Sequence, residues 1–138
     1  MVSGVLQGLS GEGALRYRHL WLAIGYVLVG LVIYLSVKPD PIDVGKIKGV
    51  KVGHFIAYFV LMLWFAQLYP SWRARLGIAA AFVLMGVGLE YTQGLTSYRS
   101  FDYADMVDNA IGVAVGLAMG STPAGRALAR IERWMGNA

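Results

Sequence analysis

Four long apolar stretches, separated by short polar segments, run through most of the chain. The first, Leu20 to Val37, is about 18 residues long, which gives roughly 27 Å of helix and is enough to cross the hydrocarbon core of a bilayer. The pattern predicts four transmembrane helices, at about residues 20–37, 53–69, 76–95 and 105–120. The fourth is short, so we expect its first turn to lie in the interface or to be shielded by neighbouring helices.

Short polar segments end the predicted helices. Lys38 to Pro41 end the first, because X-Pro units disfavour helix and charged groups prefer water. Pro70 and a basic turn from Ser71 to Arg75 end the second, and Thr122 with Pro123 ends the fourth. The pattern therefore predicts an all-α integral membrane protein, with its four helices in an antiparallel bundle.

The two ends of the chain are expected at the membrane surface. Residues 124–138 place apolar residues and arginines on opposite sides at helical spacing, which is typical of an amphipathic helix on a membrane. A frayed, solvated tail is the alternative. The segment before Leu20 lacks the order of basic, apolar and small residues of a cleavable signal peptide, so we expect the first helix to act as an uncleaved signal.

The composition supports the membrane class. Hydrophobic residues make up 57% of the chain and charged residues only 14%, whereas about a quarter of a soluble domain is charged. With 138 residues we expect one domain, residues 1–138. The net charge is +4, but the twelve basic residues form no stripe with interleaved aromatics, so we expect no nucleic-acid partner. No cysteine is present, which excludes disulfides and thiol chemistry, and no cofactor is expected.

Basic residues beside the predicted helices indicate an orientation. By the positive-inside rule, the face with more lysine and arginine lies in the cytoplasm. The more basic face carries seven such residues and the other carries five, which places both termini in the cytoplasm. The first set is Arg16, Arg18, Arg73, Arg75, Arg126, Arg130 and Arg133; the second is Lys38, Lys46, Lys48, Lys51 and Arg99.

The unusual polar residues are predicted to meet at one face of the membrane. In an up-and-down bundle the start of the second helix, the end of the third and the start of the fourth share that face. Because an ionisable group at membrane depth costs about 2.5 to 3.5 kcal/mol, these side chains should point into the bundle. The predicted site residues are Lys51, His54, Tyr58, Glu90, Gln93, Arg99, Asp105 and Asn109.

Two further features concern the fourth helix. The segment with Arg99 and Asp102 is predicted to be interfacial or partly re-entrant, and it leads into this helix. Below Asn109 the same side of the helix continues as Gly112, Gly116 and Gly120. Small residues are the usual contact surface of membrane helices, so this ridge is interpreted as a packing surface.

The ordered set of polar residues resembles the VanZ-like family of small bacterial membrane proteins. The resemblance covers about Ser36 to Gly120. Val50 stands where that family usually has an acidic residue, whose role is absent here or supplied by Asp43 or another group, and Asp108 receives no transferred role. The matching residues are Lys51-x-x-His54-x-x-x-Tyr58, Glu90-x-x-Gln93, and Arg99 followed by Asp105, Asn109, Gly112 and Gly116.

The resemblance implies a cellular context and no reaction. It implies a multi-pass protein of the cell envelope, in the bacterial cytoplasmic (inner) membrane. The founding member of the family is linked to low-level resistance to the glycopeptide antibiotic teicoplanin. Antibiotic resistance is therefore the context that the resemblance implies, and it is not assumed to be the native role of this chain.

Three hypotheses about function follow. In the first, an outward-facing intramembrane pocket binds the headgroup of a membrane lipid, or a lipid-like or lipoglycopeptide ligand, with Arg99 suited to a phosphate. In the second, His54 is the general acid or base of an enzyme acting on an envelope lipid, oriented by Glu90 or Asp105. No metal signature accompanies these residues, and no metal site is predicted.

The third hypothesis is a purely structural polar network, because buried polar groups must be satisfied somewhere. In it, Arg99 pairs with Asp105 or Glu90, while His54 bonds Asn109 or a glutamine of the third helix. The oligomeric state does not follow from the sequence. The four tryptophans, Trp21, Trp64, Trp72 and Trp134, are interpreted as anchors at the membrane interface.

Overall fold

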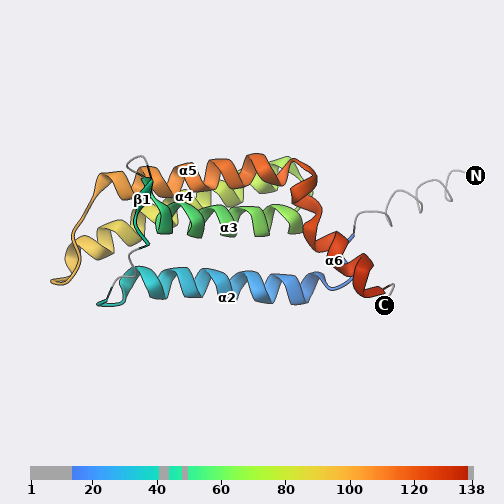
Figure 1. Cartoon of the computed structure of the whole chain (residues 1–138), viewed down its shortest axis with the longest axis horizontal. Coiled ribbons are helices and arrows are strands. Elements are labelled where there is room, and N and C mark those ends of the chain that lie inside the picture. Colours follow the sequence, from blue (N-terminus) through green and yellow to red (C-terminus); the bar gives the residue numbers. More distant parts are fainter. Residues whose placement is uncertain (1–13, 41–43, 48–49, 137–138) are drawn as a thin grey trace, which may run out of the picture.

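The computed structural model describes residues 14–40, 44–47 and 50–136. In that part of the chain four long helices lie side by side, joined by short connections (Figure 1). Each one coincides with a predicted apolar stretch to within about four residues, because uninterrupted apolar runs of this length favour helix. The long helices are α2 (Arg18–Val37), α3 (Val52–Leu68), α4 (Trp72–Leu95) and α5 (Tyr103–Gly120).

Short elements occupy the two ends of the bundle (Figure 1). At one end two antiparallel strands precede α3, with Lys46 opposite Lys51 and Ile47 opposite Val50. At the other end a 3-10 turn and a last helix follow α5. These elements are β1 (Lys46–Ile47), β2 (Val50–Lys51), η1 (Pro123–Arg126) and α6 (Ala127–Gly136).

Capping residues set where α4 and α5 begin. The predicted basic turn from Ser71 to Arg75 is wrong: Ser71 is the N-cap of α4, its Oγ accepts from the backbone N of Ala74 at 3.4 Å, and the arginines that follow are helical. Asp102 caps α5 in the same way, accepting from the backbone N of Ala104 at 2.9 Å. The connection between these helices, residues 96–102, contains no helix.

The closest helix contact is between α3 and α5. A methyl group added at Gly112 would lie 2.5 Å from the carbonyl oxygen of Phe55, and one at Gly116 would lie 2.7 Å from that of Phe59. The backbone of α3 occupies the space that a larger side chain on α5 would need. The glycine ridge therefore lets the two helices approach closely.

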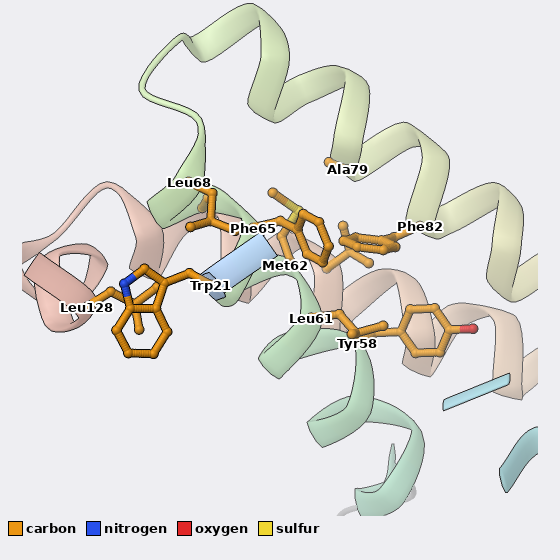
Figure 2. Close-up of a cluster of buried hydrophobic side chains, with 11 residues drawn as sticks. Trp21, Tyr58, Leu61, Met62, Phe65, Leu68, Ala79, Phe82 and Leu128 are labelled. Atoms are coloured by element: carbon orange, nitrogen blue, oxygen red, sulfur yellow. The ribbon is translucent and has the colours of Figure 1, made fainter. Parts of the chain in front are cut away.

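The apolar core follows one side of α3 (Figure 2). Leu61, Met62 and Phe65 are buried there, and Phe65 makes an edge contact with Phe82 of α4, with ring centroids 5.5 Å apart. From α2, Trp21 joins this core. The core thus connects α2, α3 and α4.

The tryptophans divide into two pairs. Trp72 and Trp134 are exposed, as an interface anchor must be. Trp21 is buried, with 9% of its surface exposed, and its Nε1 donates to Glu132 of α6 at 2.7 Å. Trp64 packs edge-on against Trp21 and donates to its carbonyl oxygen at 2.9 Å. The interpretation of Trp21 and Trp64 as interface anchors is therefore wrong: they join helices.

The C-terminal segment is helical and docked, so the frayed-tail alternative is wrong for residues 127–136. Leu128 has 2% of its surface exposed, and its backbone N donates to Gln67 Oε1 of α3 at 2.9 Å. Glu132 accepts from the backbone N of Arg16 at 2.7 Å and from that of Tyr17 at 2.8 Å. This one carboxylate therefore joins α6 to the start of α2.

Apolar surface faces outward along the bundle. Val27 of α2 and Leu84 of α4 have 70% and 69% of their surfaces exposed. Within the described residues, α2 and α4 are long and apolar enough to cross a membrane, while α3 is apolar but has 17 residues. The lengths and composition of α2 and α4 indicate membrane association. The crossing of the membrane by all four long helices stays a prediction.

Candidate functional site

An ion-paired cluster lies where the start of α3, the end of α4 and the start of α5 meet. At its centre is Asp105, with 5% of its surface exposed. Lys51, the N-cap residue of α3, places Nζ 2.5 Å from Asp105 Oδ1 and 3.7 Å from Asp102 Oδ2. Partial burial acts to lower the pKa of Lys51, but the hydrogen bond to Asp105 and the nearby carboxylates outweigh it and raise that pKa. The side chain of Lys51 is therefore protonated and positively charged at neutral pH.

His54 lies one turn further along α3 and faces α5 with both ring nitrogens. Its Nδ1 is 3.0 Å from Asn109 Oδ1, and its Nε2 is 3.5 Å from Asp105 Oδ2. Asn109 Oδ1 and Asp105 Oδ2 are both acceptors, so a hydrogen on either ring nitrogen has an acceptor on α5. The pairing of His54 with Asn109 is one that the structural hypothesis expected.

Glu90 ties α4 to the same cluster. Its surface is 1% exposed, and its Oε1 accepts from the backbone N of Asp102 at 2.6 Å. Asp102 is also the N-cap of α5, so the buried carboxylate fixes the chain at the point where that helix begins. The structure thus brings Lys51, Glu90 and Asp105 together from three elements distant in sequence.

Asp108 belongs to this cluster, although the sequence interpretation gave it no role. It has 5% of its surface exposed, and its Oδ2 accepts from the backbone N of Lys51 at 2.9 Å. A carboxylate at this place satisfies a free N–H at the start of α3 and complements the positive end of that helix. The sequence feature that could have indicated this role is its spacing, because Asp105 and Asp108 are three residues apart and share one face of α5.

Arg99 lies apart from the carboxylates, so the expected pair with Asp105 or Glu90 is wrong. Its Nη2 donates to the carbonyl oxygen of Leu35 at 2.9 Å, and its Nε to that of Lys38 at 3.4 Å. The last carbonyls of a helix have no partner within it and carry partial negative charge, which suits a guanidinium. Arg99 thus closes the end of α2.

Two more side chains bind the same end of α2. Gln93 Nε2 donates to the carbonyl oxygen of Ser36 at 2.7 Å. Tyr98 Oη donates to that of Val37 at 3.1 Å. The end of α4 and the segment after it therefore hold α2 by its carbonyl oxygens, and sequence spacing could not show this because the acceptors are backbone atoms.

A pocket of about 180 Å³ lies between the end of α2 and the cluster. Half of its lining residues have polar side chains, and they belong to α2, α3, α4 and the segment after α4. The remaining wall is apolar or glycine. The polar lining residues are Ser36, His54, Tyr58, Gln93 and Arg99, and the others are Val32, Leu35, Val44, Gly53 and Ala57.

The eight predicted site residues therefore form two groups. His54, Tyr58, Gln93 and Arg99 line the pocket. Lys51, Glu90, Asp105 and Asn109 are not among its lining residues and form the cluster beside it, with His54 contacting both groups. Among the described residues, no three His, Asp or Glu side chains are placed to hold a metal ion.

The position that distinguishes this chain from the family pattern lies in β2. Val50 pairs with Ile47 across the two strands. Asp43, which the sequence interpretation considered as a substitute carboxylate, lies outside the described residues. The carboxylates that contact Lys51 are those of Asp102, Asp105 and Asp108.

Comparisons with known proteins agree with the resemblance seen in the sequence. The family model described as VanZ/LLP1 matches residues 15–122. A curated relative, an uncharacterized protein of the fission yeast Schizosaccharomyces pombe, is 34% identical over 106 residues. The match covers 74% of this chain and 63% of the relative, so the chain spans less than two thirds of that protein. No solved structure matches the chain.

Proposed function

The chain belongs to the VanZ/LLP1 family, and we propose that it spans the membrane and holds the headgroup of an anionic amphiphile in the pocket beside His54 and Arg99. The observation that carries the proposal is the composition of the pocket wall. Basic and amide side chains lie on the same wall as aliphatic ones. An amphiphile presents the same two chemistries, a charged headgroup and an acyl chain.

The distribution of polarity supports insertion of all four long helices. Leu84 and other aliphatic residues face outward between the two ends of the bundle, whereas Glu90, Asp105 and Asn109 are buried. A protein in water favours polar residues outside and apolar residues inside. Surrounding hydrocarbon favours the arrangement seen here, with apolar residues outside and polar ones buried. α3 and α5 are the shorter helices, and they satisfy their polar groups against each other and α4.

The size and chemistry of the pocket indicate which part of a ligand it takes. Pockets that hold a drug-sized molecule measure about 300 Å³ or more, so about 180 Å³ fits a headgroup and the first part of a chain. The guanidinium of Arg99 has five N–H donors, and two atoms of it are engaged with α2. Its remaining donors suit a phosphate oxygen.

Orientation follows from the ends of the bundle. Seven arginines flank the helices at the α6 end, and the pocket lies at the other end. With the basic end in the cytoplasm, both termini are cytoplasmic and the pocket faces outward. Its location in a bacterial inner membrane stays a prediction, since the relative in fission yeast means that matching sequences are not confined to bacteria.

The two other hypotheses have less support at this site. Acid–base catalysis needs a nitrogen of His54 within reach of a substrate, and both are turned toward Asn109 and Asp105. A purely structural network accounts for Lys51, Glu90 and Asp105 but not for the pocket. The link to teicoplanin response is proposed as a consequence of amphiphile binding.

Binding of a short-chain phosphatidylglycerol to the protein in phosphatidylcholine nanodiscs tests the proposal. We expect Arg99→Gln to bind about ten-fold more weakly, as for loss of one charge-assisted hydrogen bond. Ala57→Phe adds a ring at the pocket wall and is expected to abolish binding. Ala80→Phe, the same change at an exposed position of α4, is the control and should bind as the wild type does.

Equal binding by the Ala57→Phe and Ala80→Phe proteins would overturn the pocket as the site. Competition by teicoplanin would extend the ligand class to lipoglycopeptides, and its absence would restrict the class to lipids. Mass spectrometry of the recovered probe separates binding from turnover. An intact probe supports a binding protein, and a cleaved one supports the enzyme.

A further inference from the structure

The chain turns from α5 into α6 at the end of the bundle opposite the first pocket (Figure 1). A second pocket lies at this turn. Its volume is about 380 Å³. Three of its lining residues are arginines, from η1 and α6, and the rest come from the turn after α5. The lining residues are Ser121, Thr122, Pro123, Arg126, Arg130 and Arg133.

α6 is held by the side of the helix that faces away from these arginines. Leu128 and Glu132 contact the bundle, through the core, through Gln67 and through the start of α2. Arg130 lies two residues from each of them, and residues two apart point to nearly opposite sides of a helix. The arginine face is therefore presented by a helix whose position is already fixed.

The positive charge in this pocket has no carboxylate partner in the described part of the chain. Glu132 is the acidic residue of α6, and its oxygens accept from Trp21 and from the backbone N of Arg16 and Tyr17. Desolvation acts to raise the pKa of Glu132, but these hydrogen bonds outweigh it and lower that pKa, so the group is ionised at neutral pH and its oxygens are engaged with the start of α2.

The three guanidinium groups have few other contacts. Arg130 Nη2 donates to the carbonyl oxygen of Pro123, which turns this group across the pocket. Arg126 and Arg133 have no side-chain partner among the residues that the structure describes. Three like charges on one face repel each other, and an anion between them removes that repulsion.

We propose that this pocket, defined by Arg126, Arg130 and Arg133, binds a phosphate group of an anionic ligand. A guanidinium donates two parallel hydrogen bonds to phosphate oxygens, and several together match a group with more than one negative charge. The hydroxyl groups of Ser121 and Thr122 already donate to backbone carbonyls of α5, so recognition rests on the arginines. The phosphate is carried by an anionic lipid of the adjoining leaflet or by a soluble compound.

The site is independent of the pocket beside His54. The two lie at opposite ends of α5 and share no lining residue. If the proposed orientation holds, this one faces the cytoplasmic leaflet, where anionic headgroups attract clustered basic residues. A failure of amphiphile binding at the first pocket therefore leaves this inference standing.

The test uses the full chain in phosphatidylcholine nanodiscs, with two probes. One arm replaces part of the phosphatidylcholine by phosphatidic acid and measures, by native mass spectrometry, how much phosphatidic acid the protein retains. The other arm titrates inorganic phosphate. In an Ala57→Phe background, in which the first pocket is filled, Arg133→Gln should lower retention about ten-fold, and Arg126→Gln with Arg130→Gln and Arg133→Gln should abolish it. Arg73→Gln is the matched control, at an exposed arginine near the same end.

Retention of phosphatidic acid alone supports a lipid headgroup, and binding of inorganic phosphate as well supports recognition of the phosphate group itself. The Ala57→Phe protein without further changes should still retain phosphatidic acid and bind inorganic phosphate, because the arginine pocket is intact in it. The inference is overturned if the triple variant in the Ala57→Phe background, with an unchanged melting temperature, retains phosphatidic acid as the Ala57→Phe protein does. It is also overturned if Arg73→Gln and Arg133→Gln lower retention equally, because that result means general attraction to a basic surface.

Discussion

Lys51 contacts α5 with its backbone and with its side chain. Its backbone N donates to Asp108 and its ammonium pairs with Asp105, so one residue at the start of α3 engages two carboxylates on one face of α5. His54 adds a third contact to the same face. Charges that would be costly in hydrocarbon thus satisfy one another, and the arrangement depends most on the buried carboxylate that Lys51 and His54 share.

Replacing that carboxylate should destabilise the protein. Asp105→Asn removes the charge between Lys51 and His54, and we expect the free energy of unfolding to fall by about 2 kcal/mol, since Lys51 is partly open to water. Asp40→Asn, at an exposed position outside the cluster, should change it little. Unfolding in detergent measures both variants. Equal free energies of unfolding for the Asp105→Asn and Asp40→Asn proteins would mean that the charge of Asp105 does not stabilise the fold.

The contact of Glu132 with α2 should depend on pH. Its pKa is lowered from an ordinary value of 4.5, so its contribution is fully present above pH 4.5 and is lost as the pH falls through the lowered pKa. Glu132→Gln should cost about 1 kcal/mol at pH 7, as for loss of a capping carboxylate. Melting curves from pH 7 downward should show the two proteins converging in acid. A gap that stays constant with pH would contradict this account.

Among the elements, α5 carries the sharpest steric requirement. Gly112→Ala places a methyl group 2.5 Å from the backbone oxygen of Phe55, and overpacking of this kind costs about 1 to 3 kcal/mol. Gly30→Ala is the control, because a methyl there meets nothing within 4 Å. That change should stabilise α2 by up to about 1 kcal/mol through helix propensity. Thermal unfolding should therefore move in opposite directions in the two variants.

The helices could be predicted from the sequence because each is an apolar run of helical length. The start of α4 could not, since hydropathy excludes arginines from a membrane helix although arginine is a good helix former and Ser71 is a good cap. The role of Asp108 was not predicted, because the interpretation followed the family pattern, which has no acidic residue at this position, and not the helical spacing from Asp105. The role of Glu132 was invisible, because it depends on how two ends of the chain meet in space.

Part of the site could be predicted for the same reason. Antiparallel helices place Lys51, Glu90 and Asp105 at one end of the bundle whatever the details of packing. The separation of Arg99 from the carboxylates could not be predicted, because the competing acceptors are carbonyl oxygens at the end of α2, which no sequence pattern marks. A polar pocket was predicted from the sequence, but not that Glu90 and Asp105 would lie beside it and not line it.

At the scale of the whole molecule, the absence of cysteine from the sequence permits a direct test of topology. Ser71 and Ser97 are exposed beyond the two ends of α4. In intact cells we expect a membrane-impermeant maleimide to label Ser97→Cys and to reach Ser71→Cys only after permeabilisation. Labelling of both from the same side would mean that α4 does not cross the membrane. The opposite order would reverse the orientation.

The pocket lies at the end of the bundle that is proposed to face outward, and photo-crosslinking tests its occupant most directly. A photoreactive residue is placed at Val44, on the pocket wall, or at Leu84, on the outer surface of α4, in phosphatidylcholine bilayers with a minority of phosphatidylglycerol. We expect the Val44 position to capture phosphatidylglycerol well above its share of the bilayer, and the Leu84 position to capture the two lipids in proportion. Identical proportions at both positions would contradict a pocket that selects an anionic amphiphile.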